Sequence, residues 1–160
     1  MRTQLFFVTA ALALCPVAPA STQPIGWQKY VVAETGANID FPDQIFSQDA
    51  GRPDRGYGRR FQTSDSRANL TVNSITNDEN DSPASFLRKH FKLPRSAAVY
   101  RRVTGNFFAV SGFHNKNIWY NRCNFAGPFI HCVLPNYPAN EKRQWDYVVT
   151  KISNTLASRR

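Results

Sequence analysis

Two cysteines are the side chains whose spacing most clearly predicts a chemistry. Cys123 and Cys132 flank eight residues that centre on Gly127-Pro128, a pair that reverses the chain. Adjacent antiparallel strands on either side of this turn would bring the sulfurs to bonding distance, so we expect a disulfide. A loop of this size stabilises a fold by about 2–3 kcal/mol. A redox-active pair normally has only two intervening residues, so we expect a structural disulfide rather than a redox-active one.

Three histidines, His90, His114 and His131, are the other candidates for chemistry. None has a recognisable nucleophile and carboxylate beside it in the sequence, so we expect a protein that is not an enzyme. A small hydrolase of cell-envelope polymers, with His114 or His131 as the base, stays open because partners can meet in space. His114 and His131 with the two cysteines match no familiar zinc spacing, and we predict neither a metal nor a cofactor.

Arginines are gathered in two basic segments, and five of them are candidate anion-binding residues: Arg55, Arg59, Arg60, Arg101 and Arg102. The full chain carries 20 Lys and Arg against 11 Asp and Glu, a formal charge of +9. Such a charge favours anionic partners, and guanidinium groups are suited to positioning carboxylate or phosphate groups.

The first twenty residues have the pattern of an export signal. Arg2 gives a positive start, residues 5–14 are almost wholly apolar, and Ala18-Pro19-Ala20 is typical of a signal-peptidase site. We therefore predict cleavage after Ala20, which removes Cys15 and leaves residues 21–160 as one domain. The mature chain should be periplasmic or secreted, where disulfides persist. We expect no transmembrane segment after cleavage and no cytoplasmic nucleic acid as a partner.

The elements that must position these side chains follow from hydrophobic periodicity. Strands are predicted from period-two patterns and turn residues at 26–32, 38–41, 59–63, 68–75, 99–103, 106–113, 117–124 and 129–134. Ser82-Pro83 is typical of a helix start, and a stripe from Trp145 to Leu156 indicates an amphipathic C-terminal helix. The order predicts an α+β domain, an antiparallel sheet of about six to eight strands with one central and one C-terminal helix packed on it.

Six short segments carry a family resemblance: 39–42 (IDFP), 58–61 (GRRF), 82–87 (SPASFL), 100–104 (YRRVT), 120–124 (YNRCN) and 145–149 (WDYVV). With these segments the chain resembles small exported proteins of soil alphaproteobacteria, above all of the Bradyrhizobium group, a likeness that implies no particular activity. The element order is also loosely similar to the P subunit of the oxygen-evolving complex. That likeness implies a binding or assembly factor and transfers no site residues.

Three functions are consistent with these patterns. The first is a non-catalytic exported binding module whose basic face meets an anionic envelope component. The second is the envelope hydrolase. The third is an assembly or inhibitor protein with one protein partner, which predicts an exposed aromatic patch around Trp119 or Tyr137.

Overall fold

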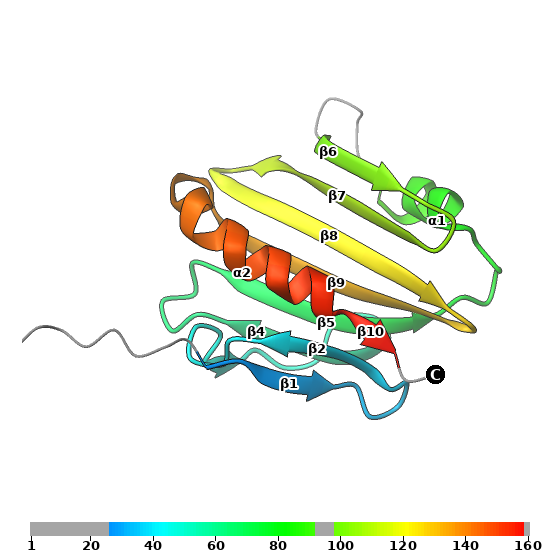
Figure 1. Ribbon diagram of the computed structural model, residues 1–160, viewed down its shortest axis with the longest axis horizontal. Helices are drawn as coiled ribbons and strands as arrows, with labels where there is room; N and C mark the ends of the chain where they lie inside the picture. The colour runs from blue at the N-terminus through cyan, green and yellow to red at the C-terminus, as the bar shows by residue number, and fades with distance from the viewer. Residues whose placement is uncertain (1–25, 92–97, 159–160) are drawn as a thin grey trace, which may run out of the picture.

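The computed structural model describes residues 26–91 and 98–158 (Figure 1). The predicted cleavage site at Ala20 lies outside the described residues. The strands are β1 (Gln28–Val31), β2 (Ala37–Phe41), β3 (Gln48–Asp49), β4 (Tyr57–Gln62), β5 (Asn69–Thr76), β6 (Ala98–Val103), β7 (Phe107–His114), β8 (Asn117–Ala126), β9 (Phe129–Pro138) and β10 (Ala157–Ser158). The helices are α1 (Pro83–His90), the short 3₁₀ helix η2 (Ala139–Glu141) and α2 (Lys142–Thr155).

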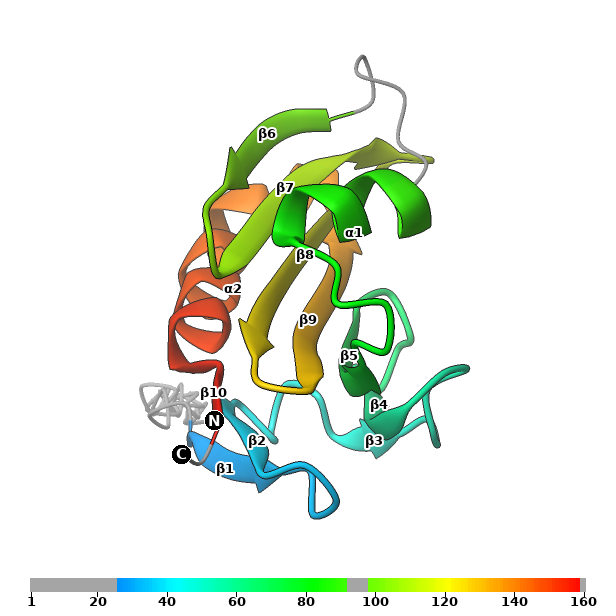
Figure 2. The ribbon, with the colours of Figure 1, turned by 90° about the vertical axis from the view of Figure 1, so that its right-hand side faces the viewer.

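A seven-stranded antiparallel sheet is the centre of the molecule, in the order β3-β4-β5-β9-β8-β7-β6. After β5 the chain passes through α1 to the far edge, and the β6–β9 meander then returns to pair with β5. The two helices lie on opposite faces of this sheet (Figure 2). The predicted α+β class, with one central and one C-terminal helix, is confirmed.

A second, smaller sheet adds to the face that α2 covers. Its order is β1-β2-β10, and it joins the first strands of the domain to the residues that follow α2. Buried side chains of β2, β5, β9 and α2 meet between the two sheets in the larger core, which includes Ile39, Leu70, Val72, Val133, Val148 and Ile152. The apolar stripe predicted for the C-terminal helix is buried here, with Trp145, Val148, Val149 and Ile152.

The helix α1 covers a second core on the opposite face of the sheet. The Ser82 hydroxyl accepts a hydrogen bond from the Ser85 N–H at 3.2 Å, and Pro83 takes the first helical position. This is the cap that the sequence predicts. Phe86 and Leu87 then pack on apolar residues of β7, β8 and β9, a set that comprises Phe108, Val110, Cys123, Ile130 and Cys132.

The predicted disulfide is present in this second core. Cys123 and Cys132 are direct partners in the β8–β9 ladder, with their Cα atoms 4.1 Å apart, and their sulfurs are bonded. Both residues are buried, at 0% and 3% exposure, so the bond ties the two central strands beneath α1.

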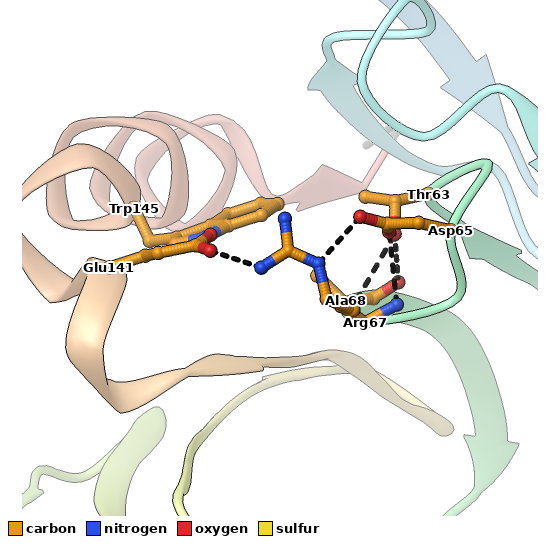
Figure 3. A network of polar contacts seen from close by, with 6 residues as sticks. All are labelled: Thr63, Asp65, Arg67, Ala68, Glu141 and Trp145. Atoms are coloured by element: carbon orange, nitrogen blue, oxygen red, sulfur yellow. Dashed lines mark hydrogen bonds and ion pairs between the residues drawn. The ribbon is translucent and has the colours of Figure 1, made fainter.

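A polar network fixes the start of α2 to the β4–β5 turn (Figure 3). The Arg67 guanidinium pairs with Asp65 in its own turn, at 2.6 Å, and with Glu141 in η2. Glu141 also accepts a hydrogen bond from the indole N–H of Trp145, at 3.1 Å. These bonds favour the ionised carboxylates and lower the pKa of Glu141, with Arg67 as the main cause. The pKa of Asp65 is lowered by bonds from Thr63 and Arg67.

The network predicts a pH-dependent contribution to stability. Because the folded state lowers the pKa of Glu141, its contribution is fully present above the ordinary carboxyl value of about 4 and is lost at lower pH. We expect Glu141→Gln to lower the melting temperature at pH 7, with a difference from wild type that shrinks below about pH 4. Thermal melts between pH 2.5 and 7 measure this. Glu34→Gln, at an exposed carboxyl, is the control, and a pH-independent difference for Glu141→Gln contradicts the prediction.

Candidate anion-binding groove

The five candidate arginines lie at two distant parts of the sheet. Arg59 and Arg60 are in β4, Arg55 is in the preceding loop, and Arg101 and Arg102 are in β6. β4 and β6 are five strand positions apart in the sheet, which is roughly 24 Å. The structure therefore does not bring the five arginines together at one site.

Carboxylates already pair with two of these arginines. Arg59 Nε lies 3.6 Å from Asp49 Oδ2, and Arg60 Nη1 lies 3.1 Å from Asp54 Oδ1. Within residues 26–91 and 98–158, the other three candidates have no carboxylate oxygen within 4.0 Å: Arg55, Arg101 and Arg102. Unpaired guanidinium groups retain more capacity for an anionic ligand, so the position of each of these three in the fold decides whether it belongs to a binding site.

Arg102 lines a groove of about 490 Å³ between α2 and the β6–β8 end of the sheet. The neighbouring Arg101 is exposed but does not line this groove, because successive residues of a strand point to opposite faces. We call this hollow the β7 groove, since its floor is formed by Ala109 and Ser111 of β7. Phe107 and Phe113, on the same face of β7, bound the floor along the strand.

The side chains that form the walls of the β7 groove lie in two rows, which are set by the register of β6, β7 and β8. Ala109 is the direct partner of Arg102 on β6 and of Arg122 on β8. Ser111 is likewise the direct partner of Tyr100 and Tyr120. Because directly opposed residues share a face, small floor residues are flanked on both sides by long side chains.

The two guanidinium groups of the first row converge on one phenyl ring. Arg102 and Arg122 place their guanidinium carbons 5.4 and 4.6 Å from the Phe107 ring centroid. The two charges can thus be no more than about 10 Å apart, a separation comparable to the Debye length at physiological salt. Arg122, like Arg102, has no carboxylate partner within the described part of the chain.

Neutral groups hold Arg122 in place. Its Nε donates to Asn124 Oδ1 at 3.1 Å, and its Nη1 donates to Ser153 Oγ of α2 at 3.4 Å. Ser153 is also hydrogen-bonded to the Tyr120 hydroxyl at 2.8 Å. These bonds orient the guanidinium without neutralising it. Sequence reasoning missed Arg122, because only the three-strand register places it opposite Arg102.

Among the described residues that line the β7 groove, the one acidic side chain is Asp146, and it forms an ion pair with Lys142. Lys142 Nζ lies 2.5 Å from Asp146 Oδ2, one helical turn away along α2. The groove lining therefore includes three cations, Arg102, Arg122 and Lys142, against one carboxylate. This balance favours an anion in the groove.

Exposed apolar side chains also gather at the β7 groove. Val99, Tyr100 and Phe113 line it and are 70%, 45% and 54% exposed. The prediction of an exposed Tyr137 is wrong: Tyr137 is only 4% exposed and stacks on Trp145, and burial raises its pKa to about 12. Trp119 is half-buried and packs against the core beneath α1.

Two further hollows among the described residues fit an anion less well. The larger, about 650 Å³, lies beside α1 and includes Arg55 and His90, but three acids line it as well: Asp78, Glu79 and Asp81. A third hollow of about 380 Å³ includes Arg55 and Arg60, with Asp54, the partner of Arg60, in its wall. Arg55 thus lines both of these hollows.

The histidines are in separate environments. His131 is 2% exposed, and its Nδ1 lies 2.8 Å from the hydroxyl of the fully buried Ser74. Thr35 donates to that same hydroxyl at 3.0 Å. Burial lowers the pKa of His131 and favours the neutral imidazole. No hydrogen bond from His131 to a carboxylate is found among the described residues, and none of the three hollows includes this histidine.

His114 is exposed at the end of β7 and contacts Asn115, while the His90 ring packs at a tilt against Phe86 in α1. In the described ranges, no three His, Cys, Asp or Glu side chains gather as a metal site. Nor is any described helix long and apolar enough to cross a membrane.

Among solved structures, the arrangement of helices around an antiparallel sheet is similar to that of the PsbP class. The solution structure of cyanobacterial PsbP (CyanoP) from Synechocystis sp. PCC 6803 matches with a TM-score of 0.63 and 7% sequence identity. The match covers 89% of this chain and 98% of that chain. The loose likeness to the P subunit of the oxygen-evolving complex is thus confirmed as a likeness of fold. No protein-family model and no curated protein sequence matches the chain.

Proposed function

We propose that this chain is an exported, non-catalytic binding protein of the periplasm or the extracellular space, and that it binds an anionic component of the cell envelope. The β7 groove is the binding site in this proposal. The leader pattern of residues 1–20 and the disulfide between Cys123 and Cys132 are both consistent with export.

The observation that carries the proposal is the pair Arg102 and Arg122. Both guanidinium groups lie within 5.4 Å of the Phe107 ring centroid, and no described carboxylate pairs with either. Two like charges repel each other at this separation, and an anion between them removes that repulsion and gains charge-assisted hydrogen bonds. The fold-level likeness to PsbP, a class expected to hold binding or assembly factors, favours binding over catalysis.

The hydrolase hypothesis has less support. A general base must reach the substrate, and His131 is buried with its hydroxyl partner, away from the three hollows. His114 is accessible, but its hydrogen bond is to the amide of Asn115 rather than to a carboxylate.

Substitution of the two groove arginines tests the proposal. We expect the double variant Arg102→Gln, Arg122→Gln to lose at least about tenfold in retention on anionic envelope material, since each arginine supplies charge-assisted hydrogen bonds. Arg101→Gln is the control, because it removes one positive charge from the residue of β6 beside Arg102 and leaves the groove lining unchanged. Equal retention of wild type and the double variant, with unchanged melting temperatures, would refute the proposal.

A protein partner is the second candidate, and the exposed apolar side chains favour it. Val99 and Tyr100 lie on β6, the terminal strand of the seven-stranded sheet, and Phe113 lies on β7 beside it. Exposed edge strands and apolar patches are common features of protein interfaces. A pull-down from periplasmic extract across a salt series separates the two candidates. A protein partner that docks on apolar surface stays bound at high salt, whereas an anion held by arginines is released.

A further inference from the structure

The β7 groove has one charged end and one aromatic section, and each fits a different part of a ligand. The charged end is the row Arg102–Ala109–Arg122, and the aromatic section is the row Tyr100–Ser111–Tyr120. Residues 109 and 111 are two positions apart on β7, so the two rows are roughly 7 Å apart along the strand. A small molecule can therefore contact both rows at once.

We propose that the β7 groove binds a small monoanion with a flat apolar body, of the aryl carboxylate class. This inference rests on the proposed anion-binding role of the β7 groove and names the ligand that the groove itself takes, a small molecule rather than an envelope polymer. The carboxylate lies between Arg102 and Arg122, and the ring lies over Ser111 between the two tyrosines.

The charged end fits a carboxylate. The guanidinium group is planar and can donate two parallel hydrogen bonds to a carboxylate. Asn124 and Ser153 already accept from Nε and Nη1 of Arg122, which leaves its second terminal nitrogen, Nη2, for a ligand. Arg102 is exposed on the opposite wall and supplies a second donor group.

The aromatic section fits a flat ring. Its floor is the small residue Ser111, and its walls are one strand to either side, about 10 Å apart from β6 to β8. Two tyrosine side chains in that width leave a slot rather than a wide cavity. Aromatic rings pack favourably in stacked or edge-to-face arrangements with such walls.

The size and ends of the groove favour a small molecule over a polymer. Its volume of about 490 Å³ is within the range of small-molecule sites. Phe107 and Phe113 bound the floor, so a linear chain that follows the strand would have to pass over a phenyl ring at each end. A small ligand avoids this obstruction.

Calorimetry with four probes tests the ligand class. The probes are 2-naphthoate, the neutral 2-naphthalenemethanol, acetate and inorganic phosphate. We expect saturable binding of 2-naphthoate, with at least about tenfold weaker binding of the other three, because each lacks the charge or the flat body. We also expect the affinity for 2-naphthoate to fall as salt is raised.

Two groove variants locate the binding. Ser111→Leu fills the floor of the aromatic section without a change of charge, and Arg102→Gln removes one donor from the charged end. Each is expected to weaken 2-naphthoate binding by about tenfold or more, while Arg101→Gln leaves it unchanged. Melting temperatures close to that of wild type establish that the variants are folded.

The outcomes separate the ligand class from the proposed function. If 2-naphthoate does not bind saturably, or binds equally to Ser111→Leu and Arg102→Gln, the aryl carboxylate assignment is overturned. If phosphate binds as tightly as 2-naphthoate, the flat body is not recognised and the assignment is overturned as well. Retention on envelope material that still depends on Arg102 and Arg122 would then leave the proposed function standing.

Discussion

Replacement of Cys123 and Cys132 together by alanine is expected to lower the free energy of unfolding by at least about 2–3 kcal/mol, the contribution of a closed loop of this length. Both sulfurs are buried beneath α1, so the substitutions also remove packing from the second core. For a domain of this size the melting temperature should fall by roughly 5–10 °C. Urea denaturation of wild type and the double variant measures the change.

A reductant gives the matched control for the disulfide. Dithiothreitol should lower the stability of wild type toward that of the double variant and leave the double variant unchanged. If both proteins respond equally to the reductant, or neither responds, the disulfide does not carry the difference. Mass spectrometry after alkylation of the folded wild type should find neither Cys123 nor Cys132 modified.

The β8–β9 hairpin could be predicted because the residues that determine it are close together in the sequence. Gly127, with a φ of 58°, forms the turn, and the cysteines lie at nearly equal distances from it. Once the turn is placed, the period of two decides which residues face each other. The same locality made the cap of α1 at Ser82 and the apolar stripe of α2 predictable.

The two shortest strands, β3 of the large sheet and β10 of the smaller sheet, could not be predicted from local pattern. β3 and β10 are two residues each, too short for any periodicity, and they exist because a partner strand is adjacent in space. β10 pairs with β2 across most of the chain, with Ala157 opposite Asn38. Tertiary packing of α2, rather than sequence near residue 157, places this strand.

The candidate site could be identified only from the register of three strands, β6, β7 and β8. In the sequence Arg101 and Arg102 are adjacent and form one basic cluster. In strand β6 they point to opposite faces of the sheet, because side chains alternate along a strand. Ala109 and Ser111 between two phenylalanines are the signal that could have indicated a groove floor. The partners that flank them, Arg122 above all, become identifiable only when β6, β7 and β8 are aligned.

Gly58→Ala is expected to be strongly destabilising, because backbone strain and a backbone clash coincide at this position. Gly58 in β4 has a φ of 134°, a conformation that is strained for any residue with a side chain. A Cβ at this position would lie 2.0 Å from the backbone oxygen of Val72, on the paired strand β5. Since a backbone oxygen cannot move without breaking the ladder, we expect a loss of at least about 3 kcal/mol.

Substitutions at two other glycines distinguish the cost of backbone strain from the cost of the steric clash with Val72. Gly51 has a φ of 89° but open space around its Cα, so Gly51→Ala measures the conformational cost alone, about 1–2 kcal/mol. Gly105 has neither a positive φ nor a close neighbour, and Gly105→Ala should change stability by less than about 0.5 kcal/mol. The expected order of destabilisation in urea is Gly58→Ala, then Gly51→Ala, then Gly105→Ala. If Gly58→Ala lowered the free energy of unfolding no more than Gly51→Ala, β5 would have to shift at Val72 at little cost. The short distance to the Val72 oxygen would then not be the reason for glycine at position 58.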